Sequence, residues 1–246
     1  MSEKFEKLKA DVARVLQRSP RMFAAASRLF YGVDRRFRTL SPDTPKAVDA
    51  AWIEAKRLQG KSLGDYYEFG VFRGYTLWHA EQSARRLGIR DSRFWGFDSF
   101  QGLPPVAGTD AEGGEFFEGQ FACSREDVLK HLTTHGAEID RITLIEGFFG
   151  DSLTPELKRE HRFRPVGVAL IDCDLYSSTK EVLDWLADLL QDNSILLFDD
   201  WKSFNEQEDR GQPLAFREFL QGRNWDPEHF EDFGRHGRSF IMQRTH

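Results

Sequence analysis

The chain has 246 residues, a net charge of −6, and 40% apolar and 30% charged residues, which suits one α/β domain with extra segments or at most two small domains. No apolar run is long enough for a transmembrane helix, the charged first residues lack the apolar core of a signal peptide, and two cysteines without a CxxC pair exclude a disulfide framework. We therefore expect a cytoplasmic protein without a membrane partner, and the acidic balance disfavours a nucleic-acid partner.

The first 60 residues have the pattern of helices. Apolar residues recur every three or four positions over 5–16, a break follows at Ser19-Pro20, and the segments 22–31 and 47–58 are again rich in apolar residues. No strand candidate appears before residue 64. We expect residues 1–60 to form a helical extension that supplies a lid or oligomer contacts, and residues 61–246 to form the main domain. Such an extension, with the edge strands of a sheet, allows a homodimer.

From residue 64 onward, short apolar runs alternate with amphipathic stretches. The expected strands are 66–69, 93–97, 142–145, 167–171, 195–198 and 239–243, and the expected helices between them are 76–87, 124–135, 178–190 and 213–220. This alternation predicts βαβ units and a mostly parallel sheet. Residues 100–120 are rich in glycine, proline and acids and should form a long functional loop. Binding sites in such sheets lie at the carboxyl ends of the strands.

The turn after the first expected strand combines an acid with two glycines. Gly70 and Gly74 allow the backbone to approach a ligand closely, and Thr76 could cap the next helix, whose N-terminus attracts anions. Glu68 could accept a hydrogen bond from an ammonium group, so the turn suits an amino-acid zwitterion. A purely structural turn is the alternative. The GxGxxG pattern is absent, which counts against an NAD-dependent oxidoreductase.

The next two strand ends fit a nucleoside. Asp98 ends the second strand, where an acid can bind ribose hydroxyls, although it could instead cap a turn. After the third strand, Phe148 or Phe149 could form an apolar wall for an adenine ring, or could simply belong to the core.

Four carboxylates follow the fourth and fifth strands. Asp172 and Asp174 come after one, and Asp199 and Asp200 after the other. Like charges gathered together need a cation to offset them, and hard oxygen ligands suit Mg²⁺ or another divalent ion. Helix-capping acids are the alternative. Cys173 has no histidine beside it and is expected in the core.

These strings resemble a known family. EFGVFRGYT resembles the cofactor motif of class I S-adenosylmethionine (SAM)-dependent O-methyltransferases, and FWGFDSFQGLP, FACSREDV, IEGFFGDSL, IDCDLYSSTKEVL and LLFDDW, in this order, resemble the macrocin O-methyltransferase family. Those enzymes methylate sugar hydroxyls of macrolide antibiotics such as tylosin and mycinamicin. The resemblance implies a Rossmann-like, doubly wound, mostly parallel seven-stranded sheet.

The resemblance also implies roles for individual residues. The Mg²⁺ ligands would be Asp172, Asp199 and Asp200. Asp172 and Asp174 would be catalytic, with Asp174 as the base or as a group that orients the substrate. Catechol-type relatives carry a lysine where this chain has Leu175, which excludes a lysine base there. SAM would be bound by Glu68, Gly70, Val71, Gly74, Thr76, Asp98, Ser99, Gly147, Phe148 and Asp172.

The function expected from the resemblance is metal-dependent methyl transfer to a hydroxyl of a small molecule, most simply a sugar of a glycosylated natural product. A catechol or phenol acceptor is one alternative, and a non-catalytic SAM-binding module is another. A histidine brought in by folding could replace Asp174 as the proton acceptor. A nucleic-acid methyltransferase is disfavoured by the acidity of the chain and by the lack of an NPPY-like sequence.

Overall fold

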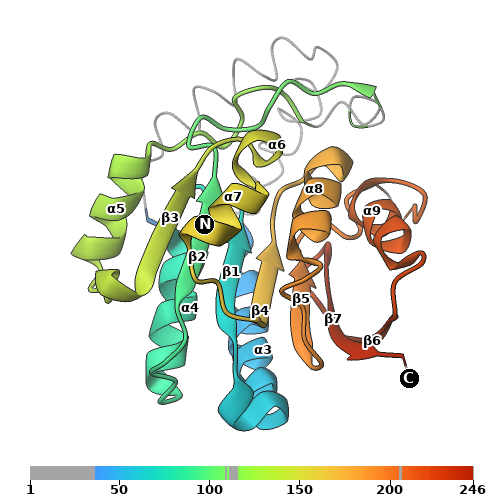
Figure 1. The fold of residues 1–246 in the computed structure, drawn as a ribbon. Helices are drawn as coiled ribbons and strands as arrows, with labels where there is room; N and C mark the ends of the chain where they lie inside the picture. The colour runs from blue at the N-terminus through green and yellow to red at the C-terminus, as the bar shows by residue number, and fades with distance from the viewer. Residues whose placement is uncertain (1–36, 109, 111–115, 205–206, 246) are drawn as a thin grey trace, which may run out of the picture.

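A seven-stranded sheet forms the centre of the computed structural model, which describes residues 37–108, 110, 116–204 and 207–245. Its order is β3-β2-β1-β4-β5-β7-β6 (Figure 1). The first five strands are parallel to one another, and β7 is antiparallel to both β5 and β6. The predicted mostly parallel sheet is therefore confirmed. The strands are β1 (Asp65–Phe69), β2 (Phe94–Asp98), β3 (Ile142–Glu146), β4 (Val166–Ile171), β5 (Ser194–Phe198), β6 (Trp225–Phe233) and β7 (Gly237–Arg244).

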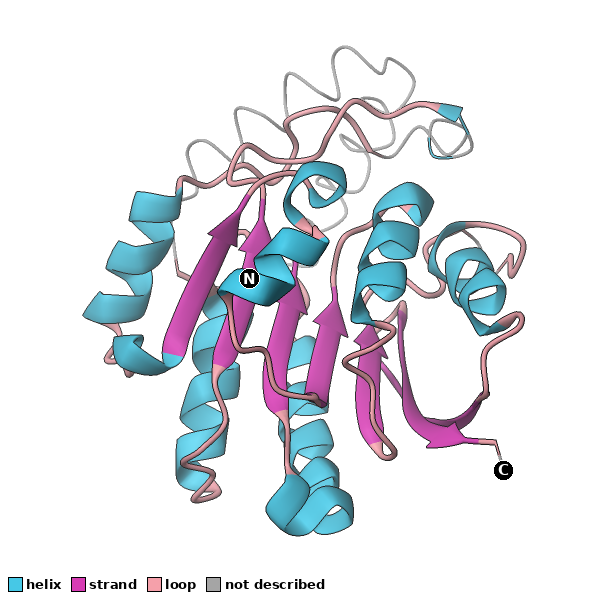
Figure 2. Cartoon of the chain, in the orientation of Figure 1, coloured by secondary structure: helices cyan, strands magenta, loops and turns pink. Residues whose placement is uncertain are grey.

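Helices cover both faces of this sheet, as a doubly wound fold requires (Figure 2). The described residues form α3 (Thr44–Gln59), α4 (Tyr75–Arg86), α5 (Arg125–Thr134), α6 (Phe149–Ser152), α7 (Pro155–Glu160), α8 (Tyr176–Leu186) and α9 (Gly211–Leu220). Short 3₁₀ turns, η1 (Gly60–Ser62) and η3 (Ile139–Arg141), precede β1 and β3. None of the helices in these ranges is long and apolar enough to cross a bilayer.

The core lies in two layers because neighbouring residues of a strand point to opposite faces of the sheet. On β1, Tyr66 packs in the cluster that contains Trp52 of α3, and Tyr67 packs in the cluster that contains Leu183 of α8. All four side chains are fully buried. The continuous apolar runs of the central strands follow from this burial on both faces.

The helix expected over 47–58 is confirmed by α3, which contacts α4, β4 and β5. Val48, Ala51, Trp52 and Ala55 form its fully buried stripe. The described end of the N-terminal region is therefore part of the core. The helices expected over 5–16 and 22–31 lie outside the described residues.

The main differences from the predicted elements are β6 and the short helices α6 and α7, none of which the apolar pattern indicated. β6 pairs with β7 alone and is an edge strand of the sheet. Between its buried ends, Trp225 and Phe233, it carries charged residues and Pro227. An edge strand tolerates such residues because one side of its backbone needs no partner strand.

The strand order places a crevice between β1 and β4. From β1 the chain adds β2 and β3 on one side, whereas β4 and β5 lie on the other, and such a reversal opens a ligand site at the carboxyl ends of the strands. Gly70 follows β1 with φ +95°, and a Cβ atom there would lie 1.8 Å from the carbonyl oxygen of Asp172. Only glycine lets the two strand ends approach this closely.

Candidate active site

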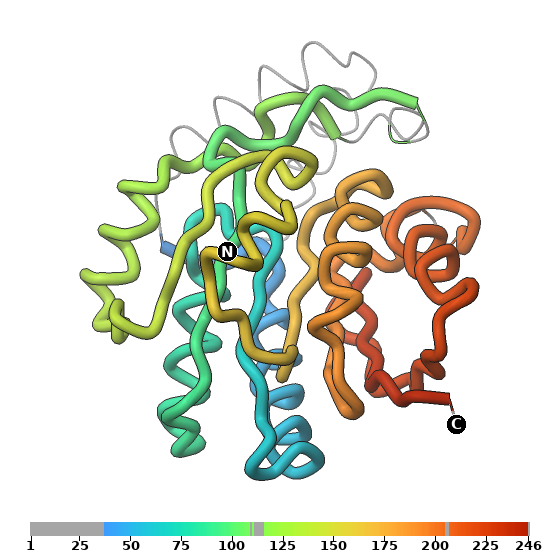
Figure 3. Tube along the Cα trace, in the orientation of Figure 1, coloured from blue at the N-terminus to red at the C-terminus, as the bar shows by residue number. Residues whose placement is uncertain are grey.

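A cavity of about 550 Å³ lies at this crevice. The described parts of the 100–120 loop run above the carboxyl ends of the strands (Figure 3) and contribute to its lining. All residues predicted for the site except Gly74 line this one cavity: Glu68, Gly70, Val71, Thr76, Asp98, Ser99, Gly147, Phe148, Asp172, Asp174, Asp199 and Asp200.

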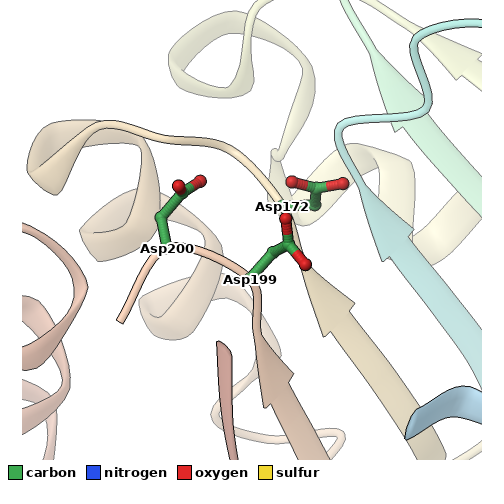
Figure 4. A group of neighbouring side chains, drawn as sticks. All are labelled: Asp172, Asp199 and Asp200. Carbon is green, nitrogen blue, oxygen red and sulfur yellow. The ribbon is translucent and has the colours of Figure 1, made fainter. Parts of the chain in front are cut away.

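Three of these acids form a cluster at the ends of β4 and β5 (Figure 4). Asp172, Asp199 and Asp200 each offer a carboxylate oxygen, and these oxygens lie within 4.8 Å of one another. Burial and the neighbouring carboxylates raise the pKa of Asp172 far above its usual range, and burial and Asp200 raise the pKa of Asp199 to about 6. The Oδ2 atom of Asp200 is buried without a hydrogen-bond partner. An orphaned oxygen among crowded carboxylates fits a divalent cation.

Asp199 and Asp200 of the cluster also accept hydrogen bonds from protein hydroxyls. Asp199 accepts from the hydroxyls of Ser41 and Thr44, and Asp200 Oδ1 accepts from Ser203 Oγ at 2.6 Å. These donors fix the two carboxylates in place.

A buried amide joins the two strand ends that carry the acids. Gln212 of α9 is fully buried, and its Nε2 donates to the Ile171 carbonyl at 2.9 Å. Its Oε1 accepts from the Asp200 backbone N–H at 3.0 Å. The end of β4 is thereby tied to the first residues after β5.

Asp174 lines the same cavity but lies outside the three-acid cluster. Its φ of +57° is unusual for a residue other than glycine and aims its side chain differently from that of a regular strand residue. Burial and the neighbouring Asp200 carboxylate raise its pKa. Such a carboxylate has a high affinity for a proton. Cys173, between the two acids, is buried in the core, as expected.

Glu68 is buried at the end of β1. The hydroxyl of Tyr66 donates to its Oε2 at 2.8 Å, and burial raises the pKa of Glu68 from 4.5 to about 8. A positively charged group beside such a carboxyl lowers its pKa and favours its ionised form.

Asp98 shapes the turn between β1 and α4. Its Oδ2 accepts from the N–H groups of Val71 at 2.7 Å and Phe72 at 2.9 Å, and its Oδ1 accepts from Phe100 at 2.7 Å. The turn-capping alternative for Asp98 is therefore present in the structure, while the carboxylate still borders the cavity.

The expectation that Thr76 caps α4 is wrong. The N-cap is Gly74, in the left-handed conformation with φ +79°, and it has no side chain that could cap the helix. Thr76 lies within the first turn and lines the cavity. The Leu77 N–H in this first turn donates to the Glu68 carboxyl, and the positive end of the helix dipole favours an anion nearby.

Comparison with known proteins places the chain in a family. A model of the family Macrocin-O-methyltransferase (TylF) matches residues 15–218, most of the sequence. The chain belongs to the macrocin-O-methyltransferase family. The predicted resemblance is confirmed.

Proteins with similar sequences are named as O-methyltransferases. The 8-demethyl-8-(2,3-dimethoxy-alpha-L-rhamnosyl)-tetracenomycin-C 4'-O-methyltransferase of Streptomyces olivaceus is 30% identical over 146 residues, covering 56% of this chain and 53% of that protein. Mycinamicin III 3''-O-methyltransferase of Micromonospora griseorubida is 27% identical over 145 residues, covering 56% and 55%. The chain spans about half the length of the curated relatives it matches.

Solved structures share the fold. The O-methyltransferase NovP superposes with a TM-score of 0.65 at 23% identity, over 82% of this chain and 80% of that one. The calicheamicin methyltransferase CalS11 also gives 0.65 at 23% identity, over 98% and 93%. The Rossmann-like methyltransferase fold expected for the macrocin-O-methyltransferase family is thus confirmed.

Several residues of the site escaped sequence reasoning. Ser41, Thr44, Ser203 and Gln212 are common polar residues, and only the fold brings them to the acids. His236 lies in the β6–β7 turn, beyond the segment that matches the macrocin-O-methyltransferase model. It lines the cavity, and its buried Nδ1 has no hydrogen-bond partner. The antiparallel pairing of β7 with β5 places the β6–β7 turn beside Asp199. The sequence did not predict this turn, because it did not predict β6.

Proposed function

We propose that this protein is a divalent-metal-dependent O-methyltransferase that moves a methyl group from SAM to a hydroxyl of a sugar in a glycosylated small molecule. One observation carries the proposal. The acid-and-glycine turn after β1 and the three-aspartate cluster after β4 and β5 share one cavity, in a chain of the macrocin-O-methyltransferase family. The relative from Streptomyces olivaceus bears the name of a rhamnosyl-containing compound, which supports a sugar acceptor.

We assign the cofactor to the part of the cavity lined by residues at the ends of β1, β2 and β3. Glu68 would accept hydrogen bonds from the ammonium group of SAM, and the N-terminus of α4 near Thr76 would attract its carboxylate. Asp98 and Ser99 bind the ribose hydroxyls with lone pairs that the turn leaves free. Phe148 borders the cavity outside both core clusters, so its ring is available as a wall for adenine beside Gly147.

The metal would be held by Asp172, Asp199 and Asp200. A divalent cation bound there supplies Lewis acidity that lowers the pKa of the acceptor hydroxyl.

Asp174 takes the proton of the acceptor hydroxyl as the methyl group moves. The acceptor oxygen forms a bond to the methyl carbon, the bond from that carbon to sulfur breaks, and S-adenosylhomocysteine leaves with the electron pair on sulfur. A carboxylate whose pKa is raised by burial is a better base than one in water. Asp172 contributes by holding the acceptor in line, which removes much of the entropic barrier.

The rest of the cavity wall receives the acceptor. This part of the wall is lined by residues 38–41, the 100–120 loop, the segment after Asp200, and His236. We assign residues 1–60 to an extension whose described end helps to build this wall, and residues 61–246 to the methyltransferase domain.

Calorimetric titration with SAM and S-adenosylhomocysteine, followed by transfer assays with and without Mg²⁺, tests the proposal. We expect micromolar cofactor binding and Mg²⁺-dependent methylation of one compound in a panel of rhamnosides, nucleotide deoxysugars and catechol. Asp199→Asn should retain cofactor binding within about threefold and lose at least about 99% of the transfer rate, as loss of a metal role predicts. Full activity of this variant in EDTA would refute the metal role, and turnover of catechol alone would refute the sugar acceptor.

A further inference from the structure

Two hydroxyls from the N-terminal region reach the three-aspartate cluster. Ser41 Oγ donates to Asp199 Oδ2 at 3.0 Å, and Thr44 Oγ1 donates to Asp199 Oδ1. The partners are 158 and 155 residues apart in sequence. Each oxygen of this carboxylate thus accepts from a different hydroxyl, which fixes the plane of the carboxylate.

Both hydroxyls belong to a rigid local structure. Thr44 is the first residue of α3 and is only 2% exposed. The Thr39 hydroxyl donates to the Ser41 carbonyl and accepts from the Ser41 N–H, both at 3.0 Å, and Thr44 N–H donates to the same carbonyl at 3.2 Å. The turn and the helix start therefore hold the two donors at a defined spacing.

A second anchor of this segment lies away from the acids. The ring of Phe37 stacks on His135 at 4.1 Å between centroids and contacts Tyr75, Trp78 and His131. None of the metal-cluster aspartates takes part in this contact. Docking of the segment and the hydrogen bonds to Asp199 can therefore be disturbed separately.

We propose that Ser41 and Thr44 are positioning residues that orient Asp199 for the divalent cation, so that the end of the N-terminal region completes the metal site. This inference rests on the proposed function, since it presupposes that the cluster binds a metal. Groups that hydrogen-bond to a metal ligand set its orientation, and their loss typically weakens metal binding 10- to 100-fold. By linkage, cation binding also strengthens the attachment of the segment.

The test uses the full chain and Mn²⁺ alone, with the free ion counted by electron paramagnetic resonance. Thr44→Val keeps the shape of the side chain and removes its hydroxyl, and Ser41→Ala removes the other. We expect each variant to weaken Mn²⁺ binding by about tenfold and the double variant by more. Thr44→Ser restores a hydroxyl and should bind within about threefold of the wild type, whereas Asp199→Ala should not bind measurably.

Phe37→Ala is the matched control, because it loosens the same segment without touching Asp199. We expect it to retain Mn²⁺ affinity within about threefold. The inference is overturned if the wild type binds Mn²⁺ and both hydroxyl variants match it, or if Phe37→Ala weakens binding as much as Thr44→Val does. Absence of Mn²⁺ binding by the wild type would instead overturn the proposed metal-dependent function, and the inference with it.

Discussion

Glu68 is a buried carboxyl that lines the cavity. Burial raises its pKa from 4.5 to about 8, so the empty protein holds a proton there at pH 7. In the proposed function, the ammonium group of the cofactor binds Glu68 and favours its ionised form, so binding at pH 7 would release this proton. Cofactor affinity therefore increases as the pH rises toward 8. Above pH 8 the amino group of the ligand loses its own proton, and the affinity falls again.

We predict that the affinity for S-adenosylhomocysteine rises between pH 6.5 and 8 by up to about tenfold per pH unit, which corresponds to one released proton. Calorimetry in buffers of different ionisation enthalpy measures both the affinity and the proton. Glu68→Gln should bind about 10- to 100-fold more weakly at pH 8 and lose the rise, because a charge-assisted hydrogen bond is gone. A rise that persists in this variant would place the titrating group elsewhere.

At the scale of elements, the 100–120 loop is fastened to a helix start. No side chain near α8 in sequence caps it, and its N-cap position is Leu175. Asp110 from the loop takes that role, because its carboxylate accepts from the N–H groups of Tyr176 at 2.7 Å and Ser177 at 3.3 Å. The helix dipole adds to this contact. The loop that borders the cavity is thus held by the helix that follows Asp174.

We predict that Asp110→Ala lowers the free energy of unfolding by about 1 kcal/mol, the usual effect of losing an N-cap. The variant should also speed chymotryptic cleavage in the loop after Phe116 or Phe117. Ser124→Ala is the control, since Ser124 caps α5 by accepting from the Asp127 N–H at 3.1 Å. Ser124→Ala should lower the free energy of unfolding by about the same amount as Asp110→Ala and leave loop cleavage unchanged. Equal cleavage rates in all three proteins would show that Asp110 does not hold the loop.

At the scale of the whole molecule, the sequence predicted the parts that have a strong local signal. Five parallel strands and β7 appeared as apolar runs, with boundaries within two residues of those observed. The acids at the strand ends could be grouped because parallel strands end at one edge. Long-range partners carry no such signal. The packing of distant segments brings Asp110 to the start of α8, Thr44 to Asp199, and the turn with His236 to the cavity. The prediction for Thr76 was wrong because Gly74, in the left-handed conformation, is the N-cap of α4.

The buried acids also set how the stability of the entire fold depends on pH. Burial and mutual repulsion raise the pKa values of Asp172, Asp174 and Asp199 above the 3.8 of an exposed aspartate. Between that value and the raised pKa values the folded state holds more protons than the unfolded state, so stability falls as the pH rises. In the proposed function, a divalent cation at the cluster would compete with these protons for the same oxygens.

We predict that the metal-free protein melts at a lower temperature at pH 8 than at pH 5.5, and that saturating Mn²⁺ raises the melting temperature more at pH 8. Each kcal/mol of binding free energy should shift it by roughly 2–4 °C for a chain of this size. Asp199→Asn should melt higher than the wild type at pH 8 without metal and should lose the response to Mn²⁺. Equal shifts at both pH values would mean that the ion binds outside the acidic cluster.

The segments attached at the end of β5 come from opposite extremes of the chain. Ser41 and Thr44 bind Asp199 from the N-terminal side, and the carbonyl of His236 accepts from the Lys202 N–H at 3.0 Å from the C-terminal side. The cofactor turn lies in between, at β1 and β2. Arg38, Leu40 and His236 from these two segments line the cavity. Under the proposed function, substitutions at these three residues would reshape the acceptor wall without altering the turn after β1. Under the proposed function, the acceptor could thus change while the residues assigned to the cofactor and the metal stay the same.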